Sequence, residues 1–228
     1  MATYSRLKVL TEMINVGLVP VFYHPDPDIT ENVIKACLDG GVRCFEFTNR
    51  GDRAYQVFSE VAIRLNKDHR LILGTGTVRE ASTAALYLQL GANFIVGPNF
   101  DPETAKLCNR HKVAYSPGCA TANEITEAES FGVEICKVFP GSTAGGPKFI
   151  KSIRGPMPWS MLMPTGGVEA TRENISAWIN AGAVCVGIGS SLFKKDIIAN
   201  KDYNAITEMA ASIIKWIKEA RGRKDPIF

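Results

Sequence analysis

The feature that most constrains the fold is a regular alternation between short apolar runs and longer segments of helical character. Eight apolar runs recur along the chain, most of them bounded by Gly, Pro or Asp. They cover residues 18–23, 43–48, 71–77, 94–97, 113–116, 134–139, 161–165 and 185–189. Continuous apolar runs of this length predict strands that are buried on both faces, as in a parallel sheet.

Helical patterns of apolar residues follow these runs. They cover residues 29–38, 54–65, 80–90, 102–108, 122–130, 170–179 and 203–220, with 146–153 the weakest of the set. Thr30 with Glu31, and Thr121 with Glu124, predict helix starts. Glycine, the usual residue after a helix, follows several of these segments, at Gly40-Gly41, Gly91, Gly132 and Gly182.

Eight strand–helix units predict an α/β fold, and two architectures accommodate them: a closed barrel and an open doubly wound sheet. The length of 228 residues suits one barrel, which typically needs about 250. No Gly-x-Gly-x-x-Gly follows the first apolar run, which makes a dinucleotide-binding sheet the weaker choice. We therefore predict a single (β/α)8 TIM-barrel domain over residues 1–228. A further helix at about 5–16 is expected to cover the barrel floor.

Charge and composition argue against several classes of partner. The net charge of +3 is too small to indicate nucleic acid or an anionic membrane. No run approaches the roughly 18 apolar residues that a transmembrane helix needs, and the first residues lack the pattern of a signal peptide. The six cysteines form no Cys-x-x-Cys pair and fit free thiols in a reducing compartment. We expect a cytoplasmic protein with a small-molecule substrate and no nucleic-acid or membrane partner.

Lys137 is the most informative candidate for chemistry. In a barrel, catalytic groups collect at the C-terminal ends of the strands, and Lys137 lies inside the apolar run 134–139. A lysine in a buried strand is costly unless it is paired or uncharged. The uncharged amine is the nucleophile that Schiff-base chemistry requires. The alternative is a structural lysine paired with a carboxylate of the core.

Glu46 stands between Phe45 and Phe47 in the second apolar run, so the same reasoning applies to it. One interpretation is a general acid/base whose pKa is raised by burial. The other is an ion pair with a strand lysine, and the two overlap because Glu46 and Lys137 could face each other across the barrel. Arg50 follows the same strand, and its planar guanidinium group can donate two hydrogen bonds to a carboxylate. The alternative is that this loop arginine is only solvated.

Two glycine-rich turns, Thr165-Gly166-Gly167 and Gly189-Ser190-Ser191, follow the seventh and eighth predicted strands. Turns at these positions often bind phosphate through backbone N–H groups, and the alternative is that they are ordinary β–α turns. No metal site is indicated. His24, His69 and His111 are scattered, and of these only His24, after the first strand, could line the mouth.

Several motifs together resemble those of 2-keto-3-deoxy-6-phosphogluconate (KDPG) aldolase and its relatives that act on 4-hydroxy-2-oxoglutarate (KHG). The resemblance covers nearly the whole chain. Its most specific parts are Glu46-Phe47-Thr48-Asn49-Arg50, Lys137-Val138-Phe139-Pro140 and Pro164-Thr165-Gly166-Gly167-Val168. It implies a class I aldolase that needs no metal or other cofactor, assembles as a homotrimer and serves carbohydrate metabolism of the Entner–Doudoroff type.

The resemblance also implies a role for individual residues. Lys137 would form the Schiff base, and Glu46 would act as the general acid/base. The carboxylate of the substrate would be held by Arg50, Thr77 and Thr165. Pocket walls would come from Phe139 and Pro98. A distal phosphate would be received by Gly166, Gly167, Gly189 and Ser190.

The implied reaction cleaves a 2-keto-3-deoxy sugar acid to pyruvate and an aldehyde. KDPG would give glyceraldehyde 3-phosphate, and 4-hydroxy-2-oxoglutarate would give glyoxylate. The chain departs from the family pattern at Tyr23-His24, in the loop 51–53 and at Ser191, all near the expected distal end of the substrate. Two alternatives remain open at this point: a non-covalent acid/base isomerase or synthase acting on a phosphorylated sugar, and a non-catalytic barrel that binds a sugar acid.

Overall fold

The structure is a computed structural model that describes residues 2–222. Its helices are α1 (Arg6–Val16), α2 (Pro27–Asp39), α3 (Ala54–Arg64), α4 (Ala81–Gln89), α5 (Pro102–His111), α6 (Ala122–Ser130), α7 (Gly146–Arg154), α8 (Arg172–Asn180), α9 (Lys195–Ala199) and α10 (Tyr203–Arg221). Its strands are β1 (Leu18–Phe22), β2 (Cys44–Thr48), β3 (Ile72–Gly76), β4 (Phe94–Val96), β5 (Ala114–Ser116), β6 (Gly118–Cys119), β7 (Ile135–Val138), β8 (Met161–Pro164) and β9 (Val186–Ile188).

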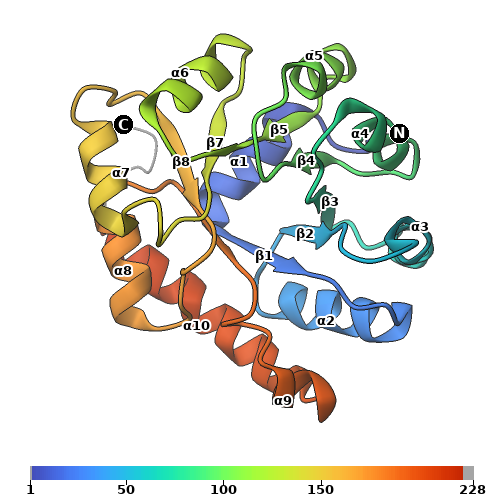
Figure 1. Ribbon diagram of the computed structural model, residues 1–228. Coiled ribbons are helices and arrows are strands. Elements are labelled where there is room, and N and C mark those ends of the chain that lie inside the picture. The colour runs from blue at the N-terminus through green and yellow to red at the C-terminus, as the bar shows by residue number, and fades with distance from the viewer. Residues whose placement is uncertain (1, 223–228) are drawn as a thin grey trace.

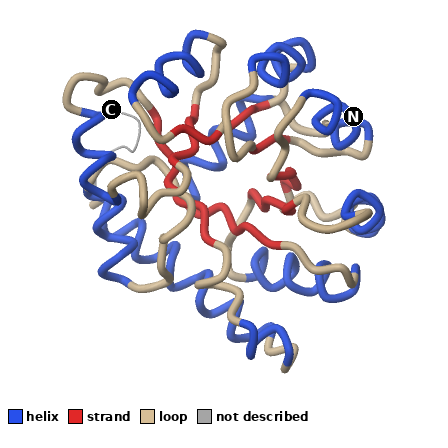
Figure 2. Tube along the Cα trace, viewed as in Figure 1, coloured by secondary structure: helices blue, strands red, loops and turns tan. Residues whose placement is uncertain are grey.

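The strands form a closed ring of parallel pairs. One sheet has the order β5-β4-β3-β2-β1-β9 and a second has the order β6-β7-β8. Thr165 pairs with Gly187, which joins the end of β8 to β9. Pro117 separates β5 from β6, because proline has no N–H for a strand ladder, yet its carbonyl still accepts the Lys137 N–H at 2.9 Å. β5 and β6 therefore fill one position of the ring, which confirms the predicted (β/α)8 barrel (Figures 1 and 2).

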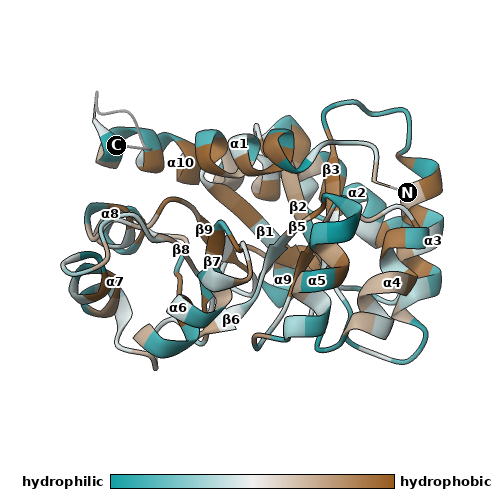
Figure 3. Cartoon of the chain, turned by 90° about the horizontal axis from the view of Figure 1, so that it is seen from above, coloured by the Kyte–Doolittle hydropathy of each residue, from teal (hydrophilic) through white to brown (hydrophobic). Residues whose placement is uncertain are grey.

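Helix α1 closes the barrel at the N-terminal ends of its strands, as the sequence predicted. Its buried residues Val9, Leu10, Met13 and Ile14 form a cluster with the first inward-facing residues of the strands, such as Cys44. The larger core cluster lies between the strands and the surrounding helices. Figure 3, turned by 90°, shows α1 across one end of the strands. Because this end is closed, a substrate must enter from the opposite end.

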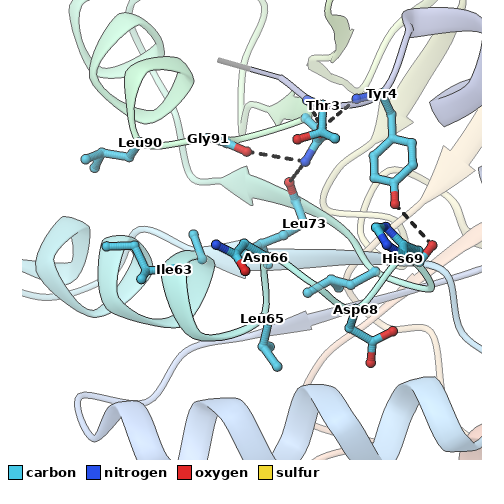
Figure 4. A pocket seen from close by; sticks show the side chains of 13 residues that line it. Thr3, Tyr4, Ile63, Leu65, Asn66, Asp68, His69, Leu73, Leu90 and Gly91 are labelled. Carbon is cyan, nitrogen blue, oxygen red and sulfur yellow. Dashed lines mark hydrogen bonds between the residues drawn. The ribbon is translucent and has the colours of Figure 1, made fainter.

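A pocket of about 270 Å³ lies beside this floor, between the ends of α3 and α4 and the segment that precedes α1 (Figure 4). Asn93 holds that segment: its Oδ1 accepts the N–H groups of Thr3 and Tyr4 at 2.8 and 3.1 Å. The Tyr4 hydroxyl donates to the carbonyl of His69 at 3.1 Å. The pocket lies at the N-terminal ends of the strands, where a barrel serves stability rather than chemistry.

Most predicted element bounds agree with the structure to within a few residues, and two expectations need correction. The helix start predicted at Thr30 is wrong, because α2 begins at Pro27 and Asp26 caps it by accepting the N–H of Asp28 at 2.8 Å. The short helix α9 was not predicted. Thr121 does cap α6 as expected. All six cysteines are buried and free. Within residues 2–222, no helix is both long and apolar enough to cross a membrane.

Candidate active site

Two ionisable side chains face each other inside the barrel. Side chains alternate between the two faces of a strand, so Glu46 on β2 points inward while Phe45 and Phe47 pack outward. Lys137 points inward from β7 in the same way. The Nζ of Lys137 lies 3.7 Å from Oε1 of Glu46, and their side chains are only 6% and 1% exposed. This distance is close enough for an ion pair but too long for a direct hydrogen bond.

A glycine on the neighbouring strand makes room for the Glu46 carboxylate. Gly76 ends β3 beside Glu46, and a Cβ at Gly76 would overlap with Oε1. Among the described residues, neither oxygen of the carboxylate has a hydrogen-bond partner. Burial raises the pKa of Glu46, and the positive charges of Lys137 and Arg50 oppose that rise. The site therefore holds a carboxyl group that takes up a proton more readily than an exposed one.

A cavity of about 440 Å³ opens at the C-terminal ends of the strands. It is lined by Val21, Phe22, Tyr23, Thr48, Arg50, Phe139, Thr165, Gly166, Gly167, Val168, Gly187, Gly189, Ser190 and Phe193. Glu46 precedes Thr48 by two residues on one inward face, and the Lys137 Nζ lies 5.0 Å from the centre of the Phe139 ring. The lysine and the carboxyl group are not themselves part of the lining, but each lies next to a residue that is: Lys137 next to Phe139, and Glu46 on the same strand face as Thr48.

The cavity gathers seven of the predicted site residues and leaves four outside its lining. Among the described residues, the lining does not include Lys137, Glu46, Thr77 or Pro98. Thr77 follows β3 in a left-handed backbone conformation, with φ of 60°, and is half-buried. The Pro98 carbonyl packs against Gly118. His24, which the sequence placed as a possible mouth residue, instead accepts the Asp26 N–H through Nδ1 at 3.1 Å.

Thr165 presents a buried hydroxyl to this cavity. Its residue is 6% exposed, and no partner for Oγ1 exists among the described residues. Gly187 on β9 lies beside it, and a Cβ at Gly187 would overlap with that Oγ1. A buried hydroxyl without a partner is costly in a protein interior. Thr165 can therefore gain a hydrogen bond when a polar ligand enters.

The two glycine-rich turns line the cavity, and the N–H groups of Gly167 and Ser190 donate to no backbone carbonyl of the described residues. The Gly166 carbonyl accepts the Ser142 N–H at 3.0 Å. In a planar trans peptide the N–H points opposite to the carbonyl, so the Gly167 N–H points away from the loop after β7. The Gly189 carbonyl likewise accepts the N–H of Leu192 at 2.9 Å, which turns the Ser190 N–H the other way. Such N–H groups can bind an anion.

Several lining residues had no role assigned from the sequence. Val21, Thr48 and Phe193 all contribute to the cavity. Thr48 is a polar residue at the end of the second predicted strand, and the alternation of side chains places it two residues after Glu46 on the same face, so the sequence does indicate it as a mouth residue. Phe193 lies beyond β9 in the turn before α9 and gave no comparable signal. In the described part of the chain, no group of three or more His, Cys, Asp or Glu side chains is arranged to hold a metal ion.

Comparison with known proteins places this site in a family. A family model described as KDPG and KHG aldolase matches residues 9–209. The chain is also 31% identical over 197 residues to 2-dehydro-3-deoxy-phosphogluconate aldolase of Pseudoalteromonas atlantica, with 86% of this chain and 89% of the relative covered. The chain belongs to the KDPG and KHG aldolase family. Like other members it is a lyase, of the kind that breaks carbon–carbon bonds.

Other relatives of this aldolase agree in sequence and fold. It is 32% identical over 152 residues to the 2-dehydro-3-deoxy-6-phosphogalactonate aldolase of Escherichia coli K12, covering 66% of this chain and 71% of that protein. A solved structure described as native KDPGal has a TM-score of 0.79 at 27% identity, over 89% of this chain and 95% of the other. The structure of Legionella pneumophila KDPG aldolase, captured with pyruvate as a covalent carbinolamine, also has a TM-score of 0.79. It is 24% identical, over 89% of this chain and 97% of the other. The last of these supports the fold alone.

Proposed function

We propose that this aldolase cleaves a 2-keto-3-deoxy sugar acid to pyruvate and an aldehyde through a Schiff base on Lys137. KDPG and 4-hydroxy-2-oxoglutarate are the substrates that the family suggests. One observation carries the proposal: a buried lysine amine lies 3.7 Å from a buried carboxyl group, beside residues that line a cavity large enough for a sugar acid. A purely structural ion pair would not need such a cavity beside it.

The Lys137 amine attacks the C2 carbonyl of the substrate and forms a carbinolamine. Loss of water from that carbinolamine gives an iminium ion, which accepts the electron pair of the C3–C4 bond when that bond breaks. Removal of the proton from the C4 hydroxyl releases the aldehyde and leaves an enamine on Lys137. Protonation of the enamine at C3, followed by addition of water to the iminium, releases pyruvate and restores the amine.

Glu46 is the group that moves these protons. A general acid/base works best when its pKa lies near the working pH, and burial moves the pKa of Glu46 upward in that direction. Its carboxyl group also lies next to the amine on which each intermediate is built. It therefore takes the C4 hydroxyl proton, directly or through one water, and returns a proton in the later steps.

Arg50 and Thr165 bind the carboxylate of the 2-oxo acid in this proposal. Both line the cavity, and the unpartnered Thr165 hydroxyl supplies a hydrogen bond. Arg50 supplies the positive charge and a planar pair of donors. Thr77 belongs to this group through the family motif, and Phe139 and Pro98 are assigned as pocket walls on the same basis. Of these three, only Phe139 lines the cavity among the described residues.

A phosphate at the far end of the substrate is held by the two glycine-rich turns. Gly166, Gly167, Gly189 and Ser190 all line the cavity, on neighbouring strand ends. Backbone N–H groups and the Ser190 hydroxyl donate to phosphate oxygens without an added lysine or arginine. Cleavage of a phosphorylated substrate would then leave glyceraldehyde 3-phosphate in this half of the cavity.

The substrate assignment is tested by a panel of 2-oxo acids. Purified protein is incubated with KDPG, its unphosphorylated analogue and 4-hydroxy-2-oxoglutarate, and released pyruvate is measured by reduction to lactate. We expect pyruvate release, with kcat/KM highest for the phosphorylated acid. If none of the panel released pyruvate, the proposed function would be rejected. Release from 4-hydroxy-2-oxoglutarate alone would retain the aldolase and remove the phosphate site.

A further inference from the structure

One side chain joins the two turns at which the distal phosphate is proposed to bind. The Oγ of Ser191 accepts the N–H of Ala170 at 2.7 Å. Ser191 follows Ser190 in the loop after β9, whereas Ala170 belongs to the loop after β8 that contains Gly166 and Gly167. Within residues 2–222 this is the one hydrogen bond that connects these two loops. Ser191 is half-buried and, among the described residues, is not part of the cavity lining.

The rest of the loop after β8 is held by other neighbours. Its start is fixed from the loop after β7, because the carbonyls of Thr165 and Gly166 accept the N–H groups of Gly141 and Ser142 at 2.8 and 3.0 Å. Near its end, Asn174 Oδ1 accepts the N–H of Glu169 at 2.9 Å. These contacts attach the loop to β7 and α8. The pairing of Thr165 with Gly187 fixes only the start of the loop against β9, so its later part, at Ala170, is held against the loop after β9 by Ser191.

The distance between the loops matters because an anion held by both must meet donors from each at hydrogen-bond length. Hydrogen bonds weaken quickly outside about 2.7–3.2 Å, and binding sites need their groups placed to within about 0.5 Å. The Gly167 and Ser190 N–H groups are carried by different loops. A shift of one loop relative to the other would weaken the contact of one donor with a shared phosphate.

We propose that Ser191 is a positioning residue that holds the two turns at the spacing required by a phosphate monoester on the aldehyde half of the substrate. The inference rests on the proposed function and deepens it, because it makes the distal site specific for a phosphorylated substrate. Ser191 does not touch the substrate; it acts on Gly167 and Ser190 through the loop contact at Ala170. Loss of its hydroxyl therefore weakens binding of the phosphate and leaves the chemistry at Lys137 unchanged.

The experiment compares wild-type protein with Ser191→Ala, Ser191→Thr and a matched control, Ser5→Ala. Ser5 also accepts a backbone N–H through its Oγ, from Lys8 at 3.2 Å, but at the floor of the barrel. KM and kcat are measured with KDPG and with its unphosphorylated analogue. Trapping of pyruvate by borohydride is followed in parallel to report on the state of the lysine site.

We expect Ser191→Ala to raise KM for KDPG about 5- to 10-fold with kcat within about twofold, the effect of one lost hydrogen bond on binding. The unphosphorylated substrate and the rate of pyruvate trapping should change by less than about twofold. Ser191→Thr, which keeps the hydroxyl, should restore most of the affinity. Ser5→Ala should leave both substrates unaffected.

Equal losses on both substrates would show that Ser191 acts only on the general fold, and an unchanged KM for KDPG would show that the loop contact has no part in binding. Either result overturns the inference while the aldolase proposal stands. A wild-type protein that does not prefer the phosphorylated substrate overturns it as well. Failure of the wild-type protein itself to trap pyruvate would instead remove the proposed function, and this inference with it.

Discussion

At the residue scale, the proposed chemistry depends on a carboxyl group that is buried away from water. Glu46 is almost fully buried, and its oxygens lack hydrogen-bond partners among the described residues. Such a group is destabilising for folding unless it has a neighbouring positive charge, which Lys137 supplies. The same burial that costs stability raises the pKa of Glu46 and suits it to proton transfer.

Replacing Glu46 by Gln removes the proton carrier while keeping the shape of the side chain. We expect kcat for cleavage to fall about 10²- to 10⁴-fold, the usual contribution of a general acid/base. Pyruvate binding should persist, because Lys137 and the carboxylate-binding groups remain. Turnover close to that of the wild-type protein would remove Glu46 from the mechanism.

The pH profile of kcat/KM gives a second test of Glu46. Because its pKa is raised from the ordinary value of 4.5, the acidic limb of the profile should bend above pH 4.5. The base is active above that pKa, so activity falls as the pH decreases through it. The limb should disappear in Glu46→Gln. A limb that persisted in this variant would belong to another group.

Gly76→Ala tests whether the carboxyl group needs the space beside it. A Cβ at Gly76 would overlap with Glu46 Oε1, so the variant must displace the carboxyl group at a cost of about 1–3 kcal/mol in the free energy of unfolding. We expect kcat to fall more than about tenfold. Gly155→Ala, at a helix end where a Cβ would make only an ordinary contact with the Ser152 carbonyl at 3.5 Å, is the matched control and should keep wild-type activity. Equal behaviour of the two variants would contradict this account of β3.

At the scale of elements, the strand ends define the site and the floor stabilises it. The sequence predicted α1 as a floor helix from its apolar pattern, and this is confirmed. It did not predict how the preceding segment is held, because the contact between Asn93 and the N–H groups of Thr3 and Tyr4 spans about 90 residues. Contacts at that separation leave no local pattern in a single sequence.

Asn93→Ala tests this anchor. Asn93 is buried, accepts two N–H groups and donates to the Leu73 carbonyl at 3.2 Å. Its loss leaves several buried polar groups unpaired, which should lower the free energy of unfolding by about 2–3 kcal/mol. Because the anchor lies at the end of the barrel opposite the cavity, kcat and KM of the folded protein should stay unchanged. A change in kcat with stability intact would show that the floor and the site are coupled.

Some residues of the candidate site could be predicted from the sequence, and others could not. Lys137 and Glu46 were found because a charged residue in an apolar strand is conspicuous and because strand alternation fixes its face. The interruption at Pro117 and the helix α9 were missed, since each depends on how the ring of strands closes. The contact of Ser191 was missed for a similar reason: its partner Ala170 lies on another loop, and the contact exists only after folding.

At the scale of the whole molecule, barrel closure brings residues from distant parts of the chain to one cavity. β1 pairs with β9, with Leu18 opposite Val186, and this pairing places Val21 and Gly189 at the same mouth. The alternating pattern predicted strand–helix units, and the chain length with the absence of Gly-x-Gly-x-x-Gly favoured such a barrel over an open sheet. A single domain over residues 1–228 remains a prediction, as does a cytoplasmic location.

The family resemblance further predicts a homotrimer. Light scattering combined with size-exclusion chromatography should give a mass close to three times the 24.9 kDa of one chain. A mass that stayed near 24.9 kDa at micromolar concentration would contradict the predicted assembly without affecting the chemistry inside one barrel.

The central claim is that the Lys137 amine bonds covalently to the substrate. Wild-type protein, Lys137→Ala and a surface control, Lys151→Ala, are each incubated with pyruvate and borohydride, digested and analysed by mass spectrometry. The account predicts a reduced pyruvate adduct on Lys137 in the wild-type protein and in Lys151→Ala, and none in Lys137→Ala. An adduct on a different lysine, or cleavage activity with no adduct at all, would contradict it.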